Sequence, residues 1–423
     1  MKKVFQSINR QLSLLTAILF LLPGCSPVNS NFNSHFDENG YALKDSTYSD
    51  FHIQKPSKLK FYIEVSGSMN GFFRANKATQ FKADLWSILS YYSPIVPEIG
   101  VLTNDGTQGA SYQHATFQTM MNTGSFVSTA STKVPLMLQT IINNLNAEAG
   151  EVAVLVSDMK YSPVGAAAPA VLMAQYSTDI SKTLGHFGKA ASLVCATSNY
   201  LDNKGDDICF RSPYYYLILG RSECVAEIRN GISTLLENRG HFIDNIETGF
   251  DFGKPKYTFG IPNMCEQLEE EPTFINYEEA SDGDTCTVKL KVKLEDYRWI
   301  MAKEECFRTA FKATPQYGSE IKVGNIKMEV QNITENDKQL NRKATATIDL
   351  KIFNMATDSE VIEWSLELPD TNCSLFTEFF DNAEMENDPA KSYSLMDFVK
   401  GMFYGGVVNK ALSPNYILVS KNN

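Results

Sequence analysis

Apolar residues in the first part of the chain form short continuous runs separated by segments with helical spacing. Phe81, Leu85, Ile88 and Leu89 show that spacing after the first run. Short buried strands alternating with helices are typical of a sheet covered by helices on both faces. The pattern therefore predicts an α/β doubly wound, mostly parallel sheet over residues 57–250, whose strands include 61–65, 99–102, 152–156, 191–196 and 214–219.

Two segments of this region have a polar composition. Residues 107–131 are rich in Ser, Thr, Gln and Gly and are predicted to be a loop or irregular ribbon. Residues 199–211 contain Gly and several Asp between two apolar runs, which indicates a hairpin-like insert.

The pattern changes to period two after residue 250. Val288, Leu290, Val292 and Leu294 alternate with lysines, and similar runs cover 321–330, 344–353 and 361–368. Strands with one buried and one solvated face predict an all-β, sandwich-like domain over residues 251–370. Residues 371–423 are predicted to be a C-terminal helical tail, because 394–404 have helical spacing. We expect that helix to dock on its own chain, with a partner-binding helix as the alternative.

The first 24 residues have the organisation of a secretory signal. Lys2, Lys3 and Arg10 precede an apolar core at 12–22 that is too short to span a bilayer. The ending Leu21-Leu22-Pro23-Gly24-Cys25 resembles a bacterial lipoprotein signal. The resemblance implies that Cys25 is lipidated and that acyl chains hold the protein at a membrane. With Ser26 after the cysteine, the resemblance to such lipoproteins implies the bacterial outer membrane, on either its periplasmic or its surface face. The polar residues 25–56 are predicted to be a tether.

Charge and cysteine content narrow the function classes. The formal net charge is −11 and becomes −14 when the three positive charges of residues 1–24 are removed. An acidic chain argues against nucleic acid as a partner and against a polybasic membrane patch. Seven cysteines follow Cys25 without a C-x-x-C pair. The odd number leaves at least one thiol free, and the pairing of the others stays open.

Candidate binding chemistry follows the first apolar run. The segment Glu64-Val65-Ser66-Gly67-Ser68 places a carboxylate and two hydroxyls in a loop that precedes a helix. Open α/β sheets bind their ligands beyond the carboxyl ends of the strands. Hard oxygen ligands suit Mg²⁺, Mn²⁺ or Ca²⁺ rather than zinc. The segment therefore predicts a divalent-cation site.

The same segment resembles the metal loop of a von Willebrand factor A domain, whose pattern is Asp-x-Ser-x-Ser, with Glu64 in place of the aspartate. The resemblance implies further ligands at Thr132, before a helix, and at Asp158, after the run 152–156. Thr132 has rivals in Ser128, Thr129 and Ser131, and an N-cap role is its alternative. The implied metal ligands are Glu64, Ser66, Ser68, Thr132 and Asp158.

The resemblance implies cation-dependent binding of a protein or matrix ligand without catalysis. The five histidines are dispersed, and no zinc-protease, nucleophile-elbow or phosphate-loop motif occurs. The sequence therefore predicts no enzyme. The expected function is a lipid-anchored envelope protein that binds its ligand through a divalent cation, and the alternative is a metal-free structural subunit of a cell-envelope assembly.

Overall fold

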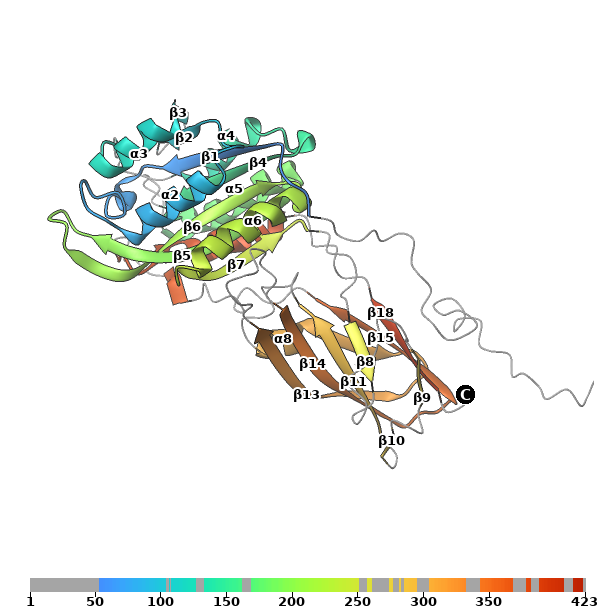
Figure 1. Ribbon diagram of the computed structural model, residues 1–423. Coiled ribbons are helices and arrows are strands. Elements are labelled where there is room, and N and C mark those ends of the chain that lie inside the picture. The colour runs from blue at the N-terminus through green and yellow to red at the C-terminus, as the bar shows by residue number, and fades with distance from the viewer. Residues whose placement is uncertain are drawn as a thin grey trace, which may run out of the picture.

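A computed structural model describes residues 53–103, 106, 108–126, 133–161, 169–250, 257–260, 274–276, 281–282, 285–294, 304–331, 343–367, 378–381, 388–406 and 414–420. Cys25, the predicted signal and most of the tether lie outside these residues, as do Thr132 and its rivals. Figure 1 shows an α/β unit followed along the chain by a β-rich unit. The coarse order predicted from the sequence, α/β and then β-rich, is confirmed.

The α/β unit contains a seven-stranded sheet in the order β3-β2-β1-β4-β6-β5-β7. Its strands are β1 (Lys58–Glu64), β2 (Ile99–Leu102), β3 (Gln108–Tyr112), β4 (Glu151–Ser157), β5 (Ala190–Leu201), β6 (Asp207–Gly220) and β7 (Phe242–Thr248). β1 pairs in parallel with β2 and β4. These are the only parallel pairings in the described part of this sheet, so the prediction of a mostly parallel sheet is wrong.

The long hairpin of β5 and β6 explains the difference. Residues 202–206 alone join the two strands, and so short a connection forces an antiparallel pair. The crossover through α5 (Pro169–Phe187) gives β4 and β5 the same direction, but β6 lies between them and pairs antiparallel with both. The tip of this hairpin extends past the neighbouring strands (Figure 1).

Helices cover both faces of the sheet. Alternate residues of β1 point in opposite directions, so Phe61 and Ile63 pack with α2 (Gln80–Tyr91), α3 (His114–Thr123) and α6 (Ser222–Glu237). Tyr62 packs on the other face with α4 (Val134–Asn143) and α5. The sequence prediction missed β3 and α3. Only Phe117 and Met121 of α3 are buried, which leaves little apolar periodicity to detect.

The β-rich unit has two main sheets. The first contains β10 (Ser281–Asp282), β11 (Thr285–Lys293), β14 (Lys343–Phe353) and β13 (Glu320–Gln331), with β8 (Tyr257–Gly260) beside β11. The second contains β12 (Phe311–Pro315), β15 (Ser359–Leu366), β18 (Asn415–Ser420) and β9 (Phe274–Asn276). Val288 and Leu290 of the first sheet share one apolar cluster with Trp364 and Val419 of the second. The short helix α8 (Glu304–Ala310) adds Phe307 to that cluster.

The C-terminal segment returns to the α/β unit before it ends in the β-rich unit. The helix α9 (Leu395–Gly405) buries Leu395, Phe398, Val399 and Met402 in the cluster that contains Tyr176 and Ile180 of α5. The expectation that this helix docks on its own chain is confirmed. β17 (Ser392–Tyr393) precedes the helix and pairs with β16 (Phe380–Asp381). None of the helices in the described part of the chain is long and apolar enough to span a membrane.

Candidate metal-binding site

The predicted site lies where β1 and β4 end side by side. The two strands are parallel and pair Ile63 with Val156, so Glu64 and Ser157 follow at the same edge of the sheet. Glu64 is completely buried, and the Ser157 hydroxyl donates a short hydrogen bond to its Oε2. The amide of Met159 donates to Ser157 Oγ at 2.8 Å. The Glu64 carboxylate is therefore bonded to a protein hydroxyl, a contact that the sequence did not predict.

Ser66 and Ser68 lie in the loop after β1, where the 3-10 helix η2 (Gly67–Met69) begins. Their hydroxyl oxygens are 2.8 Å apart. Hydrogen bonding by Ser68 lowers the pKa of the Asp158 carboxyl, which shows that this hydroxyl faces the carboxyl group. The structure thus brings together Ser66, Ser68 and Asp158, from two strand ends about 90 residues apart in sequence.

Asp158 is 1% exposed, and burial is the main influence on its pKa, which it raises. The charge of Lys160 acts in the opposite direction. Asp158 Oδ1 accepts a hydrogen bond from the Lys160 amide at 3.2 Å. Oδ2 is buried and has no hydrogen-bond partner among the described residues. A buried carboxylate oxygen without a partner is costly, so this atom is a position where a cation or a water would be stabilised.

The C-terminal segment covers this edge of the sheet. Ser392 Oγ donates to the Asp158 carbonyl at 2.9 Å, and Lys160 Nζ donates to the Asp388 carbonyl at 3.0 Å. From the other side, the Tyr200 hydroxyl donates to the Ser68 carbonyl at 2.8 Å. Ser68 is only partly buried and its neighbour Gly67 is exposed, so this loop is the more exposed side of the site. No sequence pattern connects Ser392 with Asp158, which lie 234 residues apart.

The donor set is compatible with a hard divalent cation. Two hydroxyls and a carboxylate oxygen converge, and oxygen ligands of this kind suit Mg²⁺ and Mn²⁺. Within the described ranges, no cluster of three or more His, Cys, Asp or Glu side chains occurs, so the set depends on its hydroxyls. The hydrogen bond from Ser157 engages Oε2 of Glu64, and the role of Glu64 as a direct ligand stays a prediction. The assignment of Thr132 stays a prediction, because that residue lies outside the described part.

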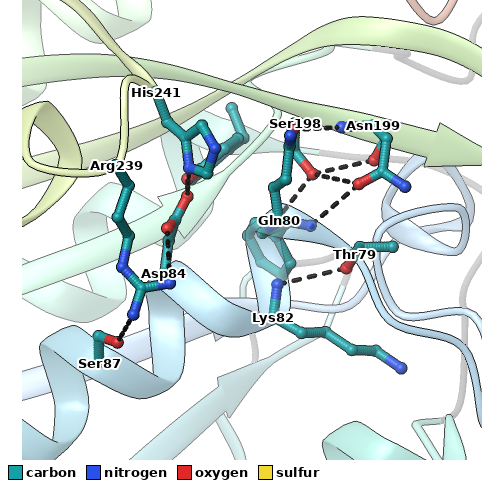
Figure 2. Close-up of polar contacts among 11 residues, drawn as sticks. Thr79, Gln80, Lys82, Asp84, Ser87, Ser198, Asn199, Arg239 and His241 are labelled. Carbon is teal, nitrogen blue, oxygen red and sulfur yellow. Dashed lines mark hydrogen bonds and ion pairs between the residues drawn. The ribbon is translucent and has the colours of Figure 1, made fainter.

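A second polar cluster, built around Asp84, fastens α2 to its neighbours (Figure 2). Asp84 is 1% exposed and accepts hydrogen bonds from the Tyr214 hydroxyl and from His241 Nδ1, each at 2.7 Å. Arg239 lies 3.5 Å from the other carboxylate oxygen. Burial raises the pKa of Asp84, and these three partners lower it. The sequence did not single out His241, whose partners lie far away along the chain.

The amino end of α2 is fixed by a further set of hydrogen bonds shown in the same view. Ser198 Oγ accepts from the amide of Phe81 at 2.8 Å, and Asn199 Oδ1 accepts from the amide of Gln80 at 2.9 Å. Thr79 caps the helix by accepting from the amide of Lys82 at 3.2 Å. The first three backbone donors of the helix are therefore satisfied by protein side chains.

Comparison with known proteins adds no relative from which a function could be transferred. Neither a protein-family model, nor a curated protein, nor a solved structure matches the chain.

Proposed function

We propose that the chain is a lipid-anchored protein of the bacterial cell envelope that binds a protein or matrix ligand through a divalent cation. Ser66, Ser68 and Asp158 are the residues proposed to hold the cation, with Thr132 as a further candidate. The proposal rests on the buried Oδ2 of Asp158, which has no hydrogen-bond partner among the described residues. The Ser68 hydroxyl acts on the same carboxyl group and lies 2.8 Å from the Ser66 hydroxyl. The N-terminal sequence around Cys25 supports the lipid anchor.

In this proposal the protein performs no chemistry. The cation keeps one coordination position for an acidic group of the ligand, and Ser68 lies on the accessible side of the site. Glu64 lies at the same edge of the sheet, where its Oε2 accepts a hydrogen bond from Ser157. A cation bound at this edge would favour the charged forms of both the Glu64 and the Asp158 carboxyl groups.

A metal-free scaffold in an envelope assembly is the second candidate. It is favoured by Lys160, whose positive charge already lowers the pKa of Asp158, and by the hydrogen bond that occupies Glu64. The contacts of Asp158 and Lys160 with the C-terminal segment fit a fixed structural junction equally well. The two candidates differ in one measurable property, the binding of a cation to the folded protein.

We expect Mg²⁺ or Mn²⁺ to raise the thermal unfolding midpoint of the full chain. A cation at one hundred times its dissociation constant adds about 2.7 kcal/mol to the free energy of unfolding. For a unit of this size, that corresponds to a rise of about 5–10 °C. The measurement is a thermal melt followed by circular dichroism, with and without a chelator.

Asp158→Asn is the variant that tests this expectation, because it removes the charge while it keeps the size of the side chain. It should abolish the metal-dependent rise. Asp358→Asn, at an exposed position of the β-rich unit, should leave the rise unchanged. A wild-type protein whose midpoint does not respond to saturating metal would favour the scaffold.

A further inference from the structure

A pocket lies beside the first two turns of α2, away from the candidate metal site. Its volume is about 420 Å³, within the usual range for small-molecule sites. Its walls come from residues 76–79, from α2 and from α3. The lining combines two lysines, Lys77 and Lys82, with polar groups such as Gln118 and with the apolar side chains of Trp86 and Met121.

Lys82 is the unusual member of this lining. It is 6% exposed, and its ammonium group donates to the carbonyls of Arg74 at 2.6 Å and Lys77 at 3.0 Å. An ammonium group has three donors, so one remains for a further partner. Lys82 points away from the cluster around Asp84, which lies two positions further along the same helix (Figure 2). No carboxylate of the described residues forms an ion pair with it.

The buried charge of Lys82 is therefore incompletely compensated. Burial is the cause that lowers its pKa, from 10.5 to about 8. The two residues whose carbonyls accept from Lys82, Arg74 and Lys77, are themselves cationic and offer no counter-charge. The pocket lining contains no Asp or Glu, although the whole chain carries a net charge of −11. An anion in this pocket would supply the missing counter-charge.

We propose that this pocket binds a small organic carboxylate, whose charged group pairs with Lys82 and whose apolar part contacts Trp86 and Met121. The carboxylate accepts from the third N–H of Lys82, and Lys77 is a second, more exposed cationic residue of the lining. An organic carboxylate can bury apolar surface against Trp86 and Met121, whereas an inorganic anion has no apolar surface to bury. This site is independent of the proposed cation site, which lies at the ends of β1 and β4.

The test is calorimetric titration of the full chain with 3-phenylpropionate, with 3-phenylpropionamide as the neutral counterpart of the same shape. We expect one saturable site for the carboxylate and at least tenfold weaker binding of the amide. Lys82→Met keeps the apolar stem and should weaken binding of the carboxylate at least tenfold. Lys322→Met, at an exposed position of the β-rich unit, should leave it unchanged.

Two further measurements keep the test decisive if Lys82→Met fails to fold. Trp86→Leu retains the lysine and should weaken binding of the carboxylate severalfold. Raising the pH from 7 to 9.5 should weaken binding of the carboxylate to the wild type roughly tenfold or more, because Lys82 loses its proton. Equal binding of the amide, or unchanged binding by folded Lys82→Met, would overturn the proposal. Inorganic phosphate that binds as tightly as the carboxylate would overturn the assignment of an organic ligand.

Discussion

Arg229→Met should lower the free energy of unfolding by about 3–5 kcal/mol. Arg229 lies on α6 and is 2% exposed, and its Nη1 donates to Oε1 of Glu247 on β7, whose side chain is fully buried. The guanidinium carbon also lies 5.5 Å from the ring centre of Phe250. Methionine keeps most of the apolar stem, so the main loss is the counter-charge of a carboxylate that has no access to water.

The double variant Arg229→Met/Glu247→Met distinguishes the cost of an unpaired buried charge from the net contribution of the ion pair to stability. Replacing both partners removes the uncompensated charge, and it should recover most of the loss because buried ion pairs contribute little net stability over apolar residues. Arg308→Met, which breaks an exposed pair with Glu304 at 3.2 Å, should cost less than about 1 kcal/mol. Free energies come from urea unfolding. A double variant as unstable as the single one would contradict this account.

Gly405→Ala should destabilise the docking of α9 by about 3 kcal/mol or more, at the upper end of overpacking effects. A Cβ atom at this position would lie 2.0 Å from the carbonyl oxygen of Ser181, on the backbone of α5. Backbone atoms of a packed helix cannot rotate away, so the two helices must separate. Alanine is favoured over glycine within a helix by about 1 kcal/mol, and a net loss therefore reports the clash.

Separation of the helices should expose the buried face of α9, which includes Phe398, Val399 and Met402. The variant should therefore be cut by trypsin at Lys391 and Lys400 under conditions in which the wild type resists. Gly109→Ala, on the edge strand β3, meets only the Val101 carbonyl at 3.3 Å and should change stability by less than about 1 kcal/mol. Unchanged proteolysis and stability in Gly405→Ala would show that α9 tolerates a wider spacing.

The proteolysis experiment also concerns the candidate site. Ser392 and Asp388 directly precede α9 and contact the backbone of Asp158 and the side chain of Lys160. Loss of α9 docking should therefore make the edge of the sheet more accessible. The C-terminal segment and the end of β4 thus form one structural unit, although more than 200 residues separate them.

Local sequence patterns determined which segments are buried. The continuous run at 152–156 is β4, fully buried on both faces, and the alternation around Val288 is β11, with one buried face. The spacing of Phe81, Leu85 and Ile88 is the buried side of α2. Such patterns are readable because periodicity and apolar content act over a few neighbouring residues. The grouping of Ser66 and Ser68 with Asp158 came from the family resemblance rather than from a local pattern.

Only the tertiary structure decided strand direction and long-range contacts. The apolar run of β6 does not reveal that it lies between β4 and β5, because a strand that is buried on both faces looks alike in either direction. The bond from Ser157 to Glu64, the cover over Asp158 and the unpaired charge of Lys82 each depend on segments that meet through folding. A local pattern encodes burial, whereas the partner of a buried group is set by the packing of the whole chain.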